Sequence, residues 1–128
     1  MKEYLMLFRS YNMADNPPTP EQAQKMLSTW QSWIQSVARD GHYVGTNRLH
    51  GESKTVFADN VVKDGPFAEG KEVVGGYLLV SAASIDDAVE IAKGCPIYGV
   101  GGSVELREVL SIDSDVRSKT FLAPLEYA

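Results

Sequence analysis

The sequence is poor in cysteine and has no cluster of basic residues. Cys95 is the single cysteine among 128 residues, which excludes an intrachain disulfide framework and a zinc site built from several cysteines. The formal net charge is −5. Binding to the phosphates of nucleic acid requires clustered Lys and Arg, so this charge pattern disfavours nucleic acid as a partner.

Long apolar runs are also absent. No stretch approaches the ~20 apolar residues that a membrane-spanning helix needs, and the N-terminal apolar stretch is too short for a signal peptide. His42 and His50 have no third ligand at a recognisable spacing, so we expect no metal site, and we expect no cofactor. With 44% hydrophobic and 23% charged residues, the composition predicts a soluble cytoplasmic protein of one domain.

Two strands are predicted to be apolar on both faces, over residues 3–9 and 73–81. In the first, Leu5 and Leu7 oppose Tyr4, Met6 and Phe8; in the second, Val73, Tyr77 and Leu79 oppose Val74, Leu78 and Val80. Strands of this kind require cover on both sides of the sheet.

A long amphipathic helix is predicted over residues 20–40. Thr19 is the expected N-cap, Pro20 stands at the first helical position, and Gln22 completes a capping box. The apolar stripe comprises Ala23, Met26, Leu27, Trp30, Trp33, Ile34, Val37 and Ala38. The helical spacing of the two tryptophans favours core packing over an aromatic ligand site.

The remaining segments complete a regular order. Strands are predicted over 42–49 and 103–109, a hairpin over 55–63, and a second helix after its N-cap Ser84. This order indicates an α+β, ferredoxin-like βαββαβ fold with an inserted β-hairpin. Both helices would cover one face of the sheet, so we expect a second copy of the chain to cover the other. Residues 1–110 would form this domain, and 111–128 a C-terminal extension that docks on the partner.

The most informative segment is the charged run 64–72, DGPFAEGKE, which separates two strand-like segments. Two residues would be enough for a simple reversal, so its length suggests a binding loop. Together with Gly75-Gly76-Tyr77, Cys95-Pro96 and GSVELR at 102–107, it resembles the YCII-related proteins of the DGPF type. The resemblance covers residues 4–109. It implies a dimeric α+β barrel of bacterial, cytoplasmic origin, with a cleft between sheet and loops.

The resemblance says less about activity. YCII proteins proper resemble enzymes with a histidine–aspartate pair whose histidine lies on the first helix, but residues 20–40 contain no histidine here. Members of the DGPF type often lie beside extracytoplasmic-function sigma factors, which implies a regulatory association.

Asp64 and Glu69 are the candidate catalytic residues. They are five positions apart around Gly65-Pro66, a spacing that can aim two carboxylates into one cleft, where one of them would act as general acid or base. The alternative for Asp64 is a turn cap.

The candidate ligand-binding residues surround this pair: Arg48, Gly65, Pro66, Phe67, Lys71, Glu72 and Tyr77. Arg48 offers a bidentate fork to a carboxylate or phosphate, with an ion pair to Glu52 or Glu72 as the alternative. Each of the other side chains also has an alternative role. Lys71 could be a solvated surface lysine, and Phe67 could fill the core beneath the loop. Tyr77 could pack in the core of the dimer. Cys95 is interpreted as a buried structural thiol.

Two functions remain open. The first is a homodimer that binds a small, anionic molecule in a cleft beside residues 64–72, with or without enzymatic activity. The alternative is a non-enzymatic regulatory or accessory protein associated with an extracytoplasmic-function sigma factor.

Overall fold

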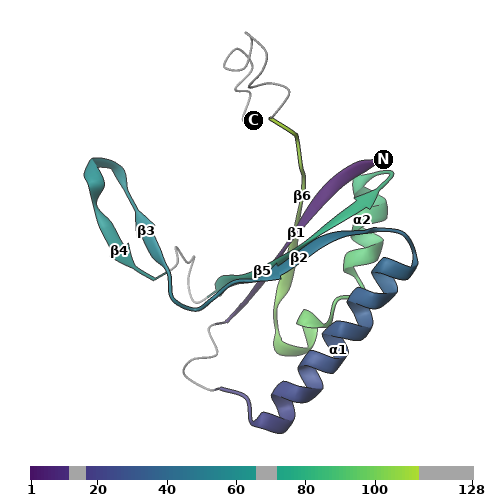
Figure 1. The fold of residues 1–128 in the computed structure, drawn as a ribbon, viewed down its shortest axis with the longest axis horizontal. Helices are drawn as coiled ribbons and strands as arrows, with labels where there is room; N and C mark the ends of the chain where they lie inside the picture. Colours follow the sequence, from purple (N-terminus) through teal and green to yellow (C-terminus); the bar gives the residue numbers. More distant parts are fainter. Residues whose placement is uncertain (12–16, 66–71, 113–128) are drawn as a thin grey trace.

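The structure, a computed structural model, describes residues 1–11, 17–65 and 72–112 (Figure 1). The elements are β1 (Lys2–Tyr11), α1 (Pro20–Arg39), β2 (Tyr43–Arg48), β3 (Lys54–Val56), a 3₁₀ turn η2 (Ala58–Asn60), β4 (Val62–Asp64), β5 (Glu72–Ala82), α2 (Ile85–Ala92), a 3₁₀ turn η3 (Pro96–Val100) and β6 (Ser103–Glu108). No described helix is both long and apolar enough to cross a membrane.

The main sheet has four antiparallel strands in the order β2-β5-β1-β6, and β3 pairs with β4 in a separate ribbon. Both helices lie on one face of the main sheet (Figure 1). This arrangement confirms the predicted α+β, ferredoxin-like fold with an inserted hairpin.

The core lies between the sheet and the helices. Its buried apolar residues are Tyr4, Met6, Phe8, Trp33, Val37, Leu78, Val80, Ala82, Ala88, Ala92, Cys95 and Ile97. Phe8 meets Trp30 edge to face, with ring centroids 4.9 Å apart, and Trp33 at 6.0 Å. Such pairs add stability beyond the area they bury. The interpretation of both tryptophans as packing residues is confirmed.

Helix α1 begins where its sequence predicts. The backbone N–H of Gln22 donates to Thr19 Oγ1 at 3.2 Å, and the backbone N–H of Thr19 donates to Gln22 Oε1 at 2.9 Å, which completes the capping box. The predicted apolar stripe is too wide, however, because Ala23, Leu27 and Ala38 are exposed. The first turns of α1 extend past the end of the sheet (Figure 1).

Several boundaries differ from the prediction. Strand β1 continues to Tyr11, β5 spans Glu72–Ala82, and β2 is shorter than predicted. Pro96–Val100 forms a 3₁₀ turn that the sequence did not suggest. Asp64 belongs to strand β4, so the segment between β4 and β5 begins at Gly65.

A bulge in β5 reverses the predicted facing of two residues, Val73 and Val74. Phe8 pairs with Gly76 but Arg9 pairs with Val74, so Gly75 is left over. Val74 therefore shares a face with Arg9, and the prediction that it shares a face with Leu78 is wrong. Val73 pairs with Ser10, so the prediction that it shares a face with Tyr77 and Leu79 is wrong as well. A one-residue shift in register moves every following side chain to the other face.

Gly102 stands where η3 meets β6, and it has no room for a side chain. A Cβ there would clash with Ile97 Cγ1 and lie 2.5 Å from the carbonyl oxygen of Arg9. A Cβ added at Gly99, three residues earlier, would meet only open space. We predict that Gly102→Ala lowers the free energy of unfolding by about 1–3 kcal/mol through overpacking, whereas Gly99→Ala changes it by under about 0.5 kcal/mol. Urea denaturation of both variants checks this; equal midpoints would contradict it.

Candidate functional site

The face of the sheet opposite the helices, called here the open face, is apolar at its centre. Leu5 is paired with Leu79, and Leu7 with Tyr77, so these four side chains lie together across β1 and β5. All four are only partly buried, and both described helices lie on the other side of the sheet. Among the residues that the structure describes, the open face is therefore an apolar surface that no helix covers.

Charged side chains border this centre on the β6 side. Glu105 Oε1 accepts from Arg9, at 3.1 Å from Nε and 3.0 Å from Nη2. Arg107 Nη1 lies 3.9 Å from the other oxygen of Glu105. Two guanidinium groups thus flank one carboxylate.

A hydrogen-bonded pair borders the centre on the β2 side. Asn47 Nδ2 donates to the Tyr77 hydroxyl at 2.7 Å. The hydroxyl accepts this bond, so its own O–H remains available as a donor. The pair therefore presents one directed donor beside an apolar surface, a combination typical of small-molecule sites.

The β3–β4 ribbon begins near the β2–β5 end of the sheet (Figure 1). Several polar contacts join the two strands at its base. Lys54 Nζ lies 2.6 Å from Asp64 Oδ1, and the backbone N–H of Gly65 donates to the Ser53 carbonyl at 2.8 Å. The Thr55 hydroxyl donates to the Gly65 carbonyl at 3.0 Å. Gly65 has φ +92°, a left-handed conformation that favours glycine. Gly65 thus has a structural reason for its identity, which does not depend on a ligand.

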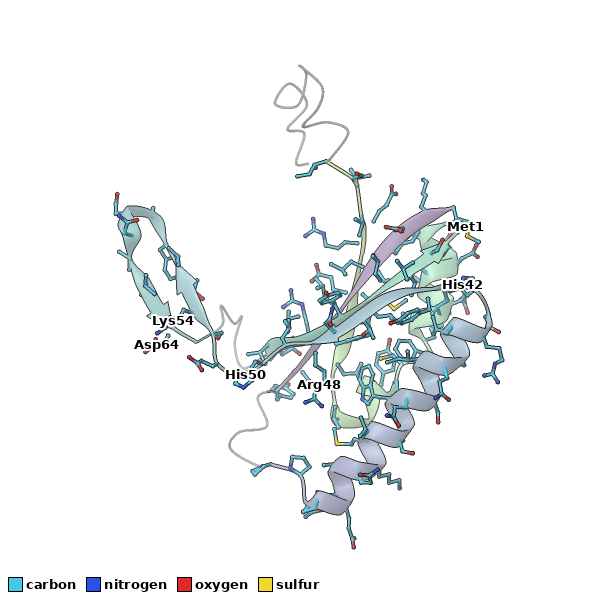
Figure 2. All side chains as sticks on the ribbon, in the orientation of Figure 1. Met1, His42, Arg48, His50, Lys54 and Asp64 are labelled. Carbon is cyan, nitrogen blue, oxygen red and sulfur yellow. The ribbon has the colours of Figure 1, made fainter. Side chains whose placement is uncertain are left out.

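The structure places the candidate catalytic residue Asp64 at the base of this ribbon (Figure 2). Its side chain is 88% exposed and is paired with Lys54. This contact, which the sequence did not predict, is an exposed ion pair of the kind that contributes about 0.2–1 kcal/mol. Glu69, Pro66, Phe67 and Lys71 lie outside the described residues.

Arg48 and Tyr77 occupy neighbouring positions but opposite faces. Arg48 is paired with Gly76, and Asn47 with Tyr77, so consecutive β2 side chains point to opposite sides of the sheet. Arg48 is exposed on the helix side (Figure 2). Within the described residues, no ion pair joins it to Glu52 or Glu72, the alternative considered for it.

The Gly75-Gly76 pair is explained by the sheet itself. A Cβ at Gly76 would lie 2.9 Å from the carbonyl oxygen of Asn47, and Gly75 is the bulge residue. The close approach at Gly76 is therefore that of strand β2 and not of a ligand.

Sequence reasoning missed four polar residues of the open face: Arg9, Asn47, Glu105 and Arg107. The alternation of Glu105 and Arg107 with apolar neighbours was a signal for β6, whereas Arg9 ends a run that is apolar on both faces of β1. No signal in the sequence connected Asn47 with Tyr77, because that contact depends on the register between β2 and β5.

Comparison with known proteins identifies the family. The sequence profile of the YCII-related domain matches residues 5–113, which is most of the chain. The chain belongs to the YCII-related domain family. An uncharacterized protein of Rhizobium meliloti (strain 1021) is 46% identical over 35 residues, which are 27% of this chain and 28% of that protein. The chain thus spans only about a quarter of the length of this curated relative in the match.

Cys95 of this YCII-related domain is buried at the end of the second helix, which confirms its interpretation as a buried thiol. Burial raises the pKa of the thiol to about 11. The nearby Tyr98 hydroxyl donates to the Ala92 carbonyl at 2.9 Å, and burial raises the pKa of Tyr98 as well. A thiol with a raised pKa is a poor nucleophile. Within the described residues, no three His, Cys, Asp or Glu side chains are grouped to hold a metal ion.

The raised pKa of Cys95 predicts a pH dependence. In the unfolded chain the thiol ionises near its ordinary pKa of 9.0, and in the folded protein only near about 11. Between these values the folded state binds more protons, so this group's contribution to stability falls as pH rises from about 9 to 11. Urea midpoints at pH 8 and pH 10 should differ less in Cys95→Ala than in the native protein. An identical pH dependence in both proteins would contradict the burial of this thiol.

Proposed function

We propose that two copies of this YCII-related domain pack through their open faces, and that the dimer binds a small anionic molecule at the β2–β5 end of the interface. The observation that carries the proposal is the open face itself. It combines the apolar centre Leu5, Leu7 and Leu79 with the directed polar pair Asn47–Tyr77.

The apolar centre supports association with a second copy. Burying apolar surface contributes roughly 25 cal/mol per Å², and each copy brings the same patch to a two-fold interface. The charged border also suits such contact, because Arg9, Glu105 and Arg107 are already paired within one copy. Charges that are paired before association cost less to bring to the rim of an interface.

The hydroxyl of Tyr77 and the border guanidinium groups support a ligand with hydrogen-bond acceptors and negative charge. In this proposal, the segment 64–72 borders the site, with Gly65 and Glu72 at its two described ends. Lys71 would add positive charge there, and Phe67 and Pro66 apolar surface. Arg48 would contribute to the positive potential from the helix side of β2.

An enzymatic role would need a general acid or base, and Asp64 with Glu69 is our hypothesis for it. The ion pair with Lys54 keeps the Asp64 carboxylate at the base of the ribbon, beside the β2–β5 end of the sheet. Under this hypothesis, Asp64 acts with Glu69 on a ligand bound by the same segment.

Leu79→Lys should dissociate the dimer, because its cross-strand neighbours Leu5 and Gly45 carry no charge, so that an unpaired ammonium would be buried in the interface at a cost of several kcal/mol. Leu27→Lys is the matched control, since Leu27 is exposed on helix α1, on the other side of the sheet. Sedimentation equilibrium of the full chain should show a dimer for the native protein and the control, and a monomer for Leu79→Lys. A monomeric native protein at micromolar concentration would overturn the dimer.

Native mass spectrometry of the purified full chain should detect a bound small molecule. We predict that Tyr77→Phe reduces its occupancy about three- to tenfold, the effect of one lost hydrogen bond. The control Tyr43→Phe, which removes a hydroxyl from an exposed β2 residue paired with the core position Val80, should not. Equal occupancy in both variants would place the ligand elsewhere. If no sample carries a ligand, the result favours the alternative function, a non-enzymatic accessory protein.

The same samples test the carboxylates. Asp64→Asn and Glu69→Gln should each weaken binding, while Asp64→Asn lowers stability by no more than about 1 kcal/mol, the contribution of an exposed ion pair. Suppose instead that Asp64→Asn alters only the melting temperature and Glu69→Gln alters nothing. Asp64 would then be a structural residue, and the catalytic hypothesis would be abandoned.

A further inference from the structure

The β3–β4 ribbon is apolar on both of its faces. Val56 is paired with Val62, so these two side chains share one face of the ribbon. The backbone N–H of Phe57 donates to the Val61 carbonyl at 2.6 Å, which places that pair at the next position and on the opposite face. The exposed fractions are 68% for Val56, 53% for Val62, 41% for Phe57 and 47% for Val61. Four large apolar side chains thus stand in solvent on two short strands.

Internal contacts give this ribbon a defined shape. At its tip, Asp59 and Asn60 both have φ +62°, a left-handed conformation that these two residue types tolerate well. The Lys63 ammonium lies 5.4 Å from the centre of the Phe57 ring, a cation–π contact. At its base, the pair Lys54–Asp64 joins the two strands.

These contacts fix the shape of the ribbon but do not cover its valine side chains. A two-stranded ribbon is marginally stable in water unless it packs against something else. Figure 1 shows β3 and β4 standing clear of the main sheet and of both helices. The ribbon therefore has an apolar surface that lacks cover from the part of the chain that the structure describes.

The direction of the ribbon indicates what covers it. It projects from the end of β2 and β5 to the side of the sheet opposite α1 and α2 (Figure 1). This is the side of the open face, through which the proposed dimer forms. A partner packed there would lie alongside the ribbon, because both occupy the same side of the sheet.

The charges of the ribbon favour a second copy over a basic partner. Lys54 and Lys63 balance Asp59 and Asp64, so the ribbon is neutral on a chain of net charge −5. A neutral apolar arm adds no repulsion between two acidic copies. An arm built for a basic protein would be expected to carry an excess of acid instead.

We propose that the β3–β4 ribbon is an arm that clasps the second copy of the chain, and that its exposed apolar pairs are buried against that copy. This inference rests on the proposed dimer. By two-fold symmetry each copy would clasp the other, so the dimer has two equivalent arm contacts in addition to the sheet-to-sheet contact. Because the arm begins at the β2–β5 end, it would also make the ligand site a shared one, bordered by both subunits.

The first test is the double variant Val56→Lys/Val62→Lys in the full chain, measured by sedimentation equilibrium. Four lysines placed in two symmetric arm contacts should raise the dimer dissociation constant at least tenfold. The matched control is Ala23→Lys/Leu27→Lys, which adds the same charge to exposed positions of α1 on the helix side. It should leave the constant within about threefold of the native value, and circular dichroism should be native-like for both variants. If the ribbon variant has the same dimer dissociation constant as the native protein, the proposal that the ribbon packs against the second copy is wrong.

The second test locates the arm directly. Ala58 is exposed at the ribbon tip and Cys95 is buried, so a spin label on Ala58→Cys reacts at the tip alone. The labelled, isotope-free variant is mixed with ¹⁵N-labelled native chain, and only contacts between copies then broaden the ¹⁵N amide signals. We expect broadening in the ¹⁵N copy. If the protein is a dimer but no ¹⁵N amide signal broadens, the proposed arm contact is wrong and the proposed dimer stands. If light scattering shows a monomer, both proposals are wrong.

Discussion

The antiparallel pairing of β1 with β5 is the interaction on which the rest of the structure depends. These two strands form the centre of the sheet, and their register sorts the apolar residues into two sets. Met6 and Leu78 face the helices and are fully buried, whereas Leu7 and Tyr77 face the other way and stay partly exposed. The two described helices cover only the first set of apolar side chains. The second set gives the molecule a surface that is apolar enough for a ligand or a partner.

The alternation of apolar residues was enough to predict this architecture from the sequence. Strand and helix order, the capping box at Thr19 and the packing role of Trp30 and Trp33 depend on contacts that are local or periodic, and all are confirmed. The predicted facings of Val73 and Val74 were wrong because the bulge at Gly75 depends on how β5 pairs with β1. No pattern within a single strand reports where a bulge will fall, although a glycine in a strand is a hint.

The candidate site was harder to predict than the fold because it depends on register between strands. Asp64 pairs with Lys54, ten positions earlier, only because the hairpin places the two opposite each other. Arg48 and Tyr77 were expected to line one cleft, but one position of β2 separates the two faces of the sheet. Asn47 takes the place beside Tyr77 for the same reason. Residue type suggested the chemistry, and only the register decided which side chains meet.

The open face and the β3–β4 ribbon are both exposed apolar surfaces, and both lie on the same side of the sheet. The proposed dimer would account for both. An apolar open face alone would suit a sheet-to-sheet dimer, and an apolar ribbon alone would suit many partners. The ribbon leaves the β2–β5 end of the sheet and projects to the side opposite the helices (Figure 1). In the proposed dimer, a second copy seated on the open face would lie on the same side of the sheet as the ribbon of the first. Under this proposal, one association event would bury both apolar surfaces and enclose the polar pair at the β2–β5 end, so that ligand binding would depend on oligomerisation.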